Sequence, residues 1–279
     1  MSLHRPESLD AAISLLAEEG AVILGGGTDV YPGLRDGVPP RWMVDVSGVP
    51  GLRGITRDGD DWRIGAATTW TDVIRADLPP LFDGLKLAAR EVGSVQIQNT
   101  ATVAGNLCNA SPAADGVPPL LAMDATVELT GPQGSRRMPL ADFILGPRHT
   151  DLASGEMMTA IRVPDGPGQS AFRKLGARRY LVISIAMVAA VVTRDADGAI
   201  RQARLAVGSC SPVARRLSTL EAALVGADAA AVASIIDATP LPEIAPIDDL
   251  RATADYRVDA ARTLVRRVIL DALEVTDVA

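Results

Sequence analysis

Two stretches of small and polar residues offer chemistry suited to binding a cofactor. Residues 25–29 read Gly-Gly-Gly-Thr-Asp and directly follow the short apolar run 22–24. Residues 102–115 read Thr-Val-Ala-Gly-Asn-Leu-Cys-Asn-Ala-Ser-Pro-Ala-Ala-Asp. Glycine permits backbone conformations that other residues resist, and it lets a ligand approach the main chain closely. Because successive backbone N–H groups in such turns bind anions, the two stretches predict a cradle for a large, phosphate-bearing cofactor.

The second stretch supplies polar groups without a full charge until its last residue. Thr102, Asn106 and Ser111 provide hydrogen-bond donors and acceptors. Asp115 ends the stretch just before the apolar run 117–123, where the start of a helix would offer free N–H groups to a phosphate. We interpret 102–115 as a binding loop, although most loops of this composition are ordered surface loops without a ligand.

The glycine-rich stretch at 25–29 does not complete a Rossmann dinucleotide fingerprint. Gly25 and Gly27 match the first two glycines of G-x-G-x-x-G, and Asp45 lies about 20 residues further on, as that motif requires. Val30 stands where the third glycine should be, and Pro32 interrupts the helix that should follow. The sequence therefore excludes a Rossmann fold and leaves either a turn that wraps a pyrophosphate or a plain tight turn.

The composition is that of an ordinary globular protein. Hydrophobic residues make up 48% of the 279 residues, charged residues 22%, and the formal net charge is −7. This acidic balance argues against nucleic-acid binding. The longest apolar run, 181–192, is interrupted by Ser184 and is too short to span a bilayer. With no apolar signal-peptide core near the N-terminus, we expect a soluble cytoplasmic protein.

Metal chemistry within this chain is not expected. The two cysteines, Cys108 and Cys210, form no C-x-x-C pair, so they cannot ligate an iron–sulfur cluster or a cysteine-rich zinc site by themselves. Two histidines are too few for a histidine metal site or for most catalytic triads. The sequence accordingly predicts no metal ligand and no acid–base catalyst.

Hydrophobic periodicity and turn residues predict both helices and strands around the two stretches. Ser8 is a suitable cap for the first helix. The turns at 57–60 and 131–134 predict two β-hairpins. The last helix carries apolar residues at helical spacing, and we expect its arginines to form a solvated face. The Pro- and Gly-rich segment 165–169 is the clearest linker and separates a domain at 1–165 from one at 170–279. Helices are expected at 8–17, 71–76, 79–91, 117–123, 217–224, 229–236 and 255–273; strands are expected at 22–24, 42–44, 52–57, 61–67, 126–130, 136–139, 157–163, 171–175, 184–193 and 200–207.

Taken together, 25–29, 98–106 and 109–115 resemble the FAD-binding subunit of the xanthine dehydrogenase family. These are the molybdenum hydroxylases, which include carbon monoxide dehydrogenase. The resemblance covers nearly the whole chain, and its C-terminal part begins at 172–174. It implies an α+β fold: a two-lobed FAD-binding domain of the vanillyl-alcohol-oxidase type, with lobes at about 1–52 and 53–165, and a small α+β C-terminal domain.

The resemblance also implies a set of cofactor-binding residues. Asp115 matches an acidic position that contacts the cofactor, and Met158 an apolar position near the flavin ring. Lys174 matches a basic position near the isoalloxazine edge, where a cation would favour the anionic reduced flavin. Tyr180 falls where relatives carry a residue that shields the ring, whereas Val92 replaces an aromatic residue of some relatives. The expected FAD-binding residues are Ile23, Leu24, Gly25, Gly26, Gly27, Thr28, Asp29, Ala101, Thr102, Gly105, Asn106, Ser111, Asp115, Met158 and Lys174.

The function that the resemblance implies is electron transfer. FAD would be held non-covalently, since no histidine or cysteine stands at an obvious attachment point. Electrons would arrive from an iron–sulfur subunit and leave to NAD, a quinone or oxygen, while a third subunit would carry the molybdopterin cofactor. Two alternatives stay open: a free-standing flavin oxidoreductase with its own small substrate, and a flavin-free scaffold that keeps the fold for assembly.

Overall fold

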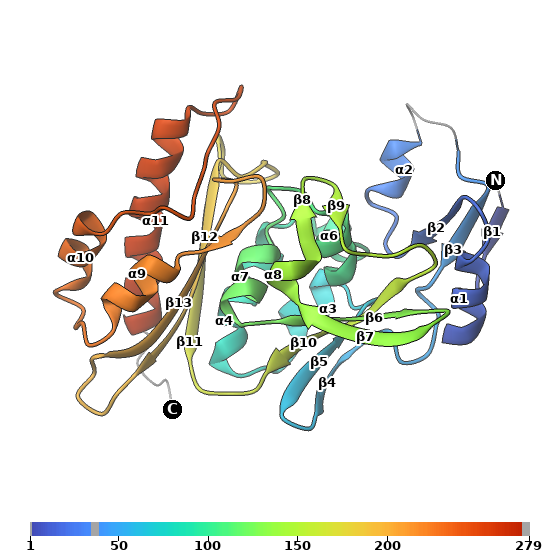
Figure 1. The fold of residues 1–279 in the computed structure, drawn as a ribbon, viewed down its shortest axis with the longest axis horizontal. Helices are drawn as coiled ribbons and strands as arrows, with labels where there is room; N and C mark the ends of the chain where they lie inside the picture. Colours follow the sequence, from blue (N-terminus) through green and yellow to red (C-terminus); the bar gives the residue numbers. More distant parts are fainter. Residues whose placement is uncertain (1, 35–38, 275–279) are drawn as a thin grey trace. The chain divides into compact units, whose positions relative to one another are not determined.

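The computed structural model describes residues 2–34 and 39–274 (Figure 1). The chain forms two compact units that interleave along the sequence: the first comprises 1–76, 95–110 and 125–165, and the second 77–94, 111–124 and 166–279. Each unit contains helices and strands, so the predicted α+β class is confirmed. The linear domains that the linker suggested stay a prediction.

The first unit begins with a small parallel sheet that carries the glycine-rich stretch. Its strands are β1 (Ser2–His4), β3 (Trp42–Asp45) and β2 (Ala21–Leu24), in that order, and the central β3 pairs in parallel with both neighbours. Helix α1 (Leu9–Leu16) starts at Ser8, whose side chain accepts a hydrogen bond from Ala11 N at 3.2 Å, as the sequence predicted. The buried face of α1 packs with residues of β3 and β10 in one apolar core.

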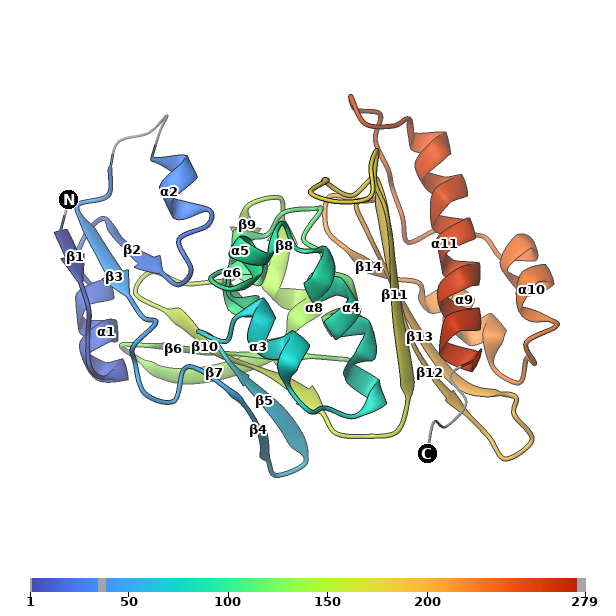
Figure 2. The same cartoon turned by 180° about the vertical axis from the view of Figure 1, so that it is seen from behind.

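A five-stranded antiparallel sheet forms the rest of the framework of the first unit (Figure 2). The hairpin around Gly59 closes at the Asp58–Asp61 pair, and that around Pro132 closes at Gly131–Gly134, so both predicted hairpins are confirmed. The strands are, in sheet order, β4 (Ile55–Asp58), β5 (Asp61–Gly65), β10 (Met157–Pro164), β6 (Thr126–Gly131) and β7 (Gly134–Pro139).

Short helices and a two-stranded ribbon complete the first unit. They are α2 (Val30–Gly33), α3 (Trp70–Arg75), α5 (Val95–Gln98), α6 (Val103–Asn109), α8 (Leu140–Phe143), β8 (Ile144–Gly146) and β9 (His149–Thr150). Helix α6 corrects the interpretation of 102–115 as a loop, which is wrong for its first half. Val103 and Leu107 are fully buried one turn apart, and this burial outweighs the loop-like composition.

The second unit is a sheet covered by helices on both faces (Figure 1). The antiparallel strands β11 (Gln169–Leu175), β12 (Ala186–Arg194), β13 (Ile200–Gly208) and β14 (Arg215–Arg216) lie in sequence order. Helices α4 (Asp83–Glu91) and α7 (Val117–Ala122) cover one face, next to the 3-10 turn η1 (Pro80–Phe82). The other face carries α9 (Ser218–Leu224) and α11 (Ala254–Glu274), against which α10 (Val232–Ala238) packs.

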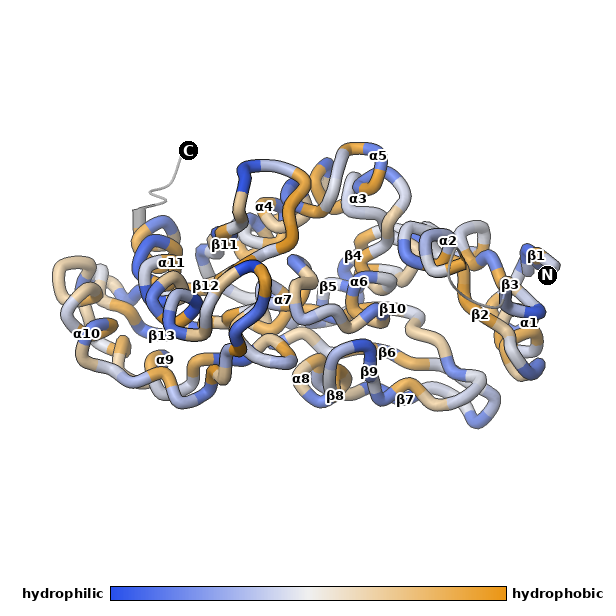
Figure 3. Tube along the Cα trace, turned by 90° about the horizontal axis from the view of Figure 1, so that it is seen from above, coloured by the Kyte–Doolittle hydropathy of each residue, from blue (hydrophilic) through white to orange (hydrophobic). Residues whose placement is uncertain are grey.

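Helix α11 is amphipathic, as predicted (Figure 3). Val265, Val268 and Ile269 are fully buried against the sheet. The expectation that its arginines form only a solvated face is wrong for Arg257, which is 3% exposed and donates to Ile185 O at 2.5 Å and Ser209 O at 2.9 Å. No helix within the described ranges is long and apolar enough to cross a membrane.

Candidate functional site

The glycine-rich stretch follows the carboxyl end of β2. Leu24, the last residue of that strand, is buried, and the chain then passes through residues 25–29 into the single turn of α2. Within the described part of the chain, the backbone N–H groups of Gly26, Gly27 and Thr28 donate to no protein acceptor. Gly27 has φ +71°, a conformation that favours glycine. These amides are therefore available to an anionic ligand.

The two stretches that the sequence singled out lie directly against each other. A Cβ atom added to Gly26 would fall 2.0 Å from the carbonyl oxygen of Thr100 and 2.8 Å from Cα of Ala101. A Cβ on Gly25 would fall 3.2 Å from Thr102 Oγ1. The contact is thus made by main chain on main chain, and Gly26 is required for it because any larger residue would collide with backbone atoms.

The second stretch is fixed from the opposite side by the start of α3. Thr69 and Thr102 form an isolated antiparallel bridge, Val103 N donates to Thr68 O at 3.0 Å, and Trp70 N donates to Ala101 O at 3.2 Å. Trp70 and Val103 are fully buried, so the backbone of this segment cannot shift freely. Residues 25–29 and 100–106, which we call the cradle, are therefore held in this arrangement by the fold itself, before any ligand binds.

Thr102 also starts helix α6. Its Oγ1 accepts a hydrogen bond from Gly105 N at 3.0 Å, which makes it the N-cap residue. Gly105 is exposed, and a Cβ atom there would lie 2.8 Å from the same hydroxyl oxygen. Asn106 follows on α6 and is half-buried. The structure thus places Ala101, Thr102, Gly105 and Asn106 in one turn beside the glycine-rich stretch.

Arg148, which sequence reasoning missed, joins both stretches. Its backbone N donates to Ala110 O at 2.9 Å, and its side chain donates to Asn109 Oδ1 at the end of α6. Its Nη1 also lies 3.8 Å from Asp29 Oδ1, at the end of the glycine-rich stretch. Only its positive charge could have drawn attention to it in the sequence.

Met158 lies in the five-stranded sheet of the first unit. It is 3% exposed and pairs with Leu129 of β6, next to a bulge between Met158 and Ala160. A bulge changes which side of a sheet the following side chains face. The predicted position of Met158 near a flavin ring stays a prediction.

Ser111, Asp115 and Lys174 belong to the second unit. Ser111 Oγ accepts from Ala113 N at 3.2 Å and so stabilises its own turn. Lys174 Nζ lies 2.6 Å from Asp115 Oδ2, and the two side chains are 5% and 8% exposed. The other carboxylate oxygen of Asp115 accepts from the hydroxyl of Ser184 at 2.8 Å. Sequence reasoning missed Ser184, which lies far from Asp115 along the chain.

This buried group combines opposite charges in a nearly dry environment. Burial raises the pKa of the Asp115 carboxyl above its ordinary value, while Lys174 and Ser184 act in the opposite direction. Lys174 Nζ has a further acceptor in Glu91 O at 3.4 Å. Lys174 is therefore one half of a buried ion pair, and its predicted position near the isoalloxazine edge stays a prediction.

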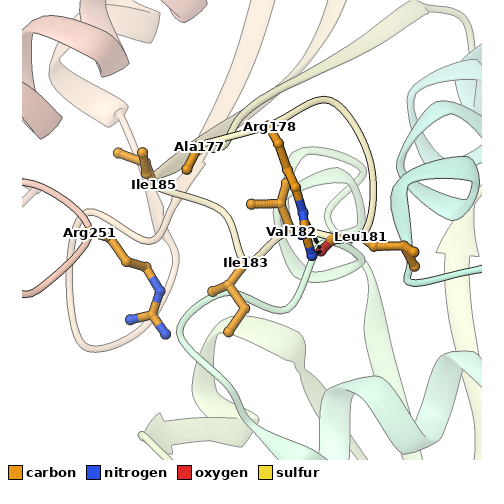
Figure 4. A pocket seen from close by; sticks show the side chains of 7 residues that line it. All are labelled: Ala177, Arg178, Leu181, Val182, Ile183, Ile185 and Arg251. Carbon is orange, nitrogen blue, oxygen red and sulfur yellow. Dashed lines mark hydrogen bonds between the residues drawn. The ribbon is translucent and has the colours of Figure 1, made fainter.

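The segment between β11 and β12 carries Tyr180 on its surface. Tyr180 is 65% exposed, and the guanidinium of Arg179 lies 5.2 Å from the centre of its ring. Arg178 donates to Leu181 O, with Nε at 3.1 Å, and Leu181 has φ +51°. Residues of this segment line a hollow of about 380 Å³ together with Ile185 and Arg251. Figure 4 shows the lining side chains, which are Ala177, Arg178, Leu181, Val182, Ile183, Ile185 and Arg251.

Across 2–34 and 39–274, no three His, Cys, Asp or Glu side chains come together in a way that could hold a metal. The cradle instead fits a diphosphate: among the described residues it offers amides without a protein acceptor, a hydroxyl and a nearby guanidinium, and its glycines allow the two segments to meet main chain against main chain.

Two family models match the chain and together cover most of it. The FAD binding domain in molybdopterin dehydrogenase matches residues 1–166, and the CO dehydrogenase flavoprotein C-terminal domain matches residues 170–272. The first of these alone covers more than half of the chain.

Individual relatives agree over nearly their full length. The xanthine dehydrogenase FAD-binding subunit of Escherichia coli O157:H7 is 34% identical, over 98% of this chain and 96% of its own. The carbon monoxide dehydrogenase medium chain of Hydrogenophaga pseudoflava is 32% identical, over 95% and 94%. Among solved structures, a Cu,Mo-CO dehydrogenase chain superposes with a TM-score of 0.87 at 29% identity, covering 98% of this chain and 97% of that one. The chain therefore belongs to the FAD-binding subunits of the xanthine dehydrogenase, or molybdenum hydroxylase, family of oxidoreductases.

Proposed function

We propose that this chain holds FAD non-covalently and transfers electrons within a multi-subunit molybdenum hydroxylase. Two electrons from reduced iron–sulfur centres in a partner subunit would pass through the flavin to an acceptor such as NAD or a quinone. A third subunit would hold the molybdopterin cofactor and oxidise the organic substrate. The proposed location is the cytoplasm, and the proposed domains are an FAD-binding domain at 1–165 and a C-terminal domain at 170–279.

The observation that carries the proposal is the main-chain contact between the glycine-rich stretch and 100–102. Among the described residues, the amides of Gly26, Gly27 and Thr28 have no protein acceptor, and Gly25 lies at the hydroxyl of Thr102. Amides arranged in this way bind phosphate groups without needing a lysine. The proposed cofactor ligands are those that the sequence predicted. Residues 23–29 would wrap the diphosphate, Asp115 would contact the cofactor, and Met158 and Lys174 would lie near the flavin ring. The second stretch would contribute Ala101, Thr102, Gly105, Asn106 and Ser111 along the diphosphate and ribityl chain.

Bound FAD would supply the redox chemistry, and the protein would supply binding, orientation and electrostatics. Relatives of similar identity are named for different substrates, xanthine and carbon monoxide. This supports a division of labour in which the choice of substrate lies with another subunit. No residue of this chain is assigned a role as acid or base toward the organic substrate.

Purification of the native complex tests the proposal. We expect a yellow protein with the absorption spectrum of oxidised flavin, whose FAD is released by denaturation, together with iron–sulfur and molybdopterin subunits. Reduction of the iron–sulfur centres should then bleach the flavin. A chain that purifies alone and oxidises a small substrate by itself would favour the free-standing oxidoreductase. A folded, colourless chain that does not respond to added FAD would refute both.

A further inference from the structure

The side chain of Arg148 lies close to both stretches and can donate hydrogen bonds to a ligand bound between them. Its side chain reaches Asn109 at the end of α6 and comes within 3.8 Å of Asp29 at the end of the glycine-rich stretch. The side chain remains 66% exposed. A guanidinium has five N–H donors in a rigid fork, so these contacts leave donors free for a further acceptor.

The two segments that form the cradle carry no positive side chain to balance a bound anion. Neither 21–34 nor 95–110 contains a lysine or an arginine, and Asp29 adds a negative charge at the edge of the cradle. The diphosphate of FAD is itself anionic, so a bare carboxylate nearby would repel it. The guanidinium of Arg148, close to that carboxylate, offsets the repulsion and offers the fork geometry that matches phosphate oxygens.

The backbone of Arg148 fixes the point from which its side chain extends. Arg148 is the second residue of the two-residue turn that joins β8 to β9, because Gly146 pairs with His149. Its φ of +59° is accounted for by this turn, since short hairpin turns require a positive φ at a central position. From this turn the side chain reaches Asn109 and comes close to Asp29.

We propose that Arg148 is a cofactor-binding residue whose guanidinium pairs with the diphosphate of FAD and shields it from Asp29. The assignment rests on the proposed function, because it requires FAD to lie in this cradle. It adds to the amide cradle the one positive charge that its two stretches lack.

The test compares FAD binding by the unliganded full chain and its variants. Arg148→Gly removes the guanidinium and also relieves the left-handed strain, so this variant should fold at least as well as the wild type. We expect its dissociation constant for FAD to rise roughly 10- to 100-fold, the range for the loss of one hydrogen bond to a charged group. Arg148→Lys should recover part of the affinity, since it restores the charge without the fork.

A salt titration separates a contact with phosphate from a purely structural role. Affinity for FAD should fall with rising salt in the wild type and fall less steeply in Arg148→Gly. Arg53→Ala is the matched control, because Arg53 is also exposed and holds Asp72 through two hydrogen bonds of 2.9 Å. It should leave both the affinity and the salt dependence unchanged.

Two results would overturn the assignment. One is an Arg148→Gly protein, shown to be folded by thermal unfolding, that binds FAD with wild-type affinity and wild-type salt dependence. The other is a wild-type chain that does not bind FAD at all, in which case the proposed function fails first. If Arg148→Gly does not fold, Arg148→Asn provides the same comparison, because asparagine tolerates the left-handed conformation.

Discussion

The glycine-rich cradle and the buried Asp115–Lys174 pair hold their polar groups in place by different contacts. In the cradle, two segments meet through main-chain atoms, and a Cβ at Gly26 would lie 2.0 Å from Thr100 O. Around Asp115, by contrast, an acidic and a basic side chain meet at 2.6 Å with almost no exposure to water. Adding a side chain at Gly26 should therefore disrupt the cradle, whereas removing the charge of Lys174 should destabilise the buried pair.

The difference also concerns what each region can contribute to binding. Backbone amides carry no net charge and do not titrate, so their contribution to binding depends on their arrangement and not on pH. A buried ion pair is costly to desolvate and seldom adds much net stability, so its retention points to a requirement for position or charge. The following predictions test this contrast, beginning with the largest expected effect.

Replacing Gly26 with valine should abolish FAD binding. The new side chain cannot fit against Thr100 and Ala101, so the two segments must separate and the amides lose their arrangement. The measurement is the FAD content of the purified chain and its titration with added FAD. Gly48→Ala is the control, since a Cβ there meets nothing within 4 Å. Normal FAD binding by Gly26→Val would show that the contact between the segments is dispensable.

Replacing Lys174 with methionine should destabilise the unliganded chain by about 3–5 kcal/mol, because the carboxylate of Asp115 is left buried without its counter-ion. Urea unfolding measures this change. The double variant Lys174→Met with Asp115→Asn should recover much of the loss, since no unpaired charge remains. Arg173→Met serves as the control on the same strand. Its partner Asp271 is 33% exposed, and such pairs contribute only about 0–1 kcal/mol. Equal losses in both single variants would contradict the contrast.

Thr102→Ala should cost about 1 kcal/mol of stability, the usual value for loss of an N-cap side chain. It should also weaken FAD binding, because the Oγ1 that accepts from Gly105 N lies at the contact with Gly25. Thr102→Ser keeps the hydroxyl and should retain most of both properties. Chemical denaturation gives the free energy of unfolding of each variant, and titration of the same samples gives the affinity for FAD. A serine variant as weak as the alanine variant would assign the role to the methyl group instead.

The smallest effect concerns acid stability of the second unit. Hydrogen bonds from Arg251 N and from the buried Arg257 lower the pKa of Asp249 to about 2. Because the folded pKa lies below the ordinary 3.8, the stabilisation is present above about pH 4 and is lost as the pH falls toward 2. Asp249→Asn should remove this part of the acid dependence, about 1 kcal/mol or less for a partly exposed group. The midpoints of urea unfolding at pH 7, 5 and 3 measure this difference. The same pH dependence of the midpoint in the wild type and in Asp249→Asn would exclude the effect.

Local patterns in the sequence predicted those elements that local residues determine. The hairpin at 57–60 follows from its turn residues, and Ser8 and the apolar spacing predicted α1 correctly. Helix α6 was missed because glycine, asparagine and alanine resemble a loop, while the cap at Thr102 and the burial of Leu107 depend on the folded surroundings.

The candidate site shows the same limit. The glycines and amides were visible as motifs, and the family resemblance connected them. Arg148 and Ser184 were not visible, because each acts on a residue that only the fold brings near it. The pairing of Lys174 with Asp115 likewise could not be inferred, since a single sequence carries no information on which distant charges meet.

Helices α4 and α7 come from the N-terminal half of the chain, yet they form one of the two coverings of the β11–β13 sheet. Gly84 N donates to Ser170 Oγ at 2.8 Å, and a Cβ on Gly84 would meet Ala171 O at 3.0 Å. A chimera that exchanged only residues 166–279 with a relative would therefore place a foreign sheet against resident helices. Engineers who wish to recombine these subunits should transfer 77–94 and 111–124 together with the C-terminal part.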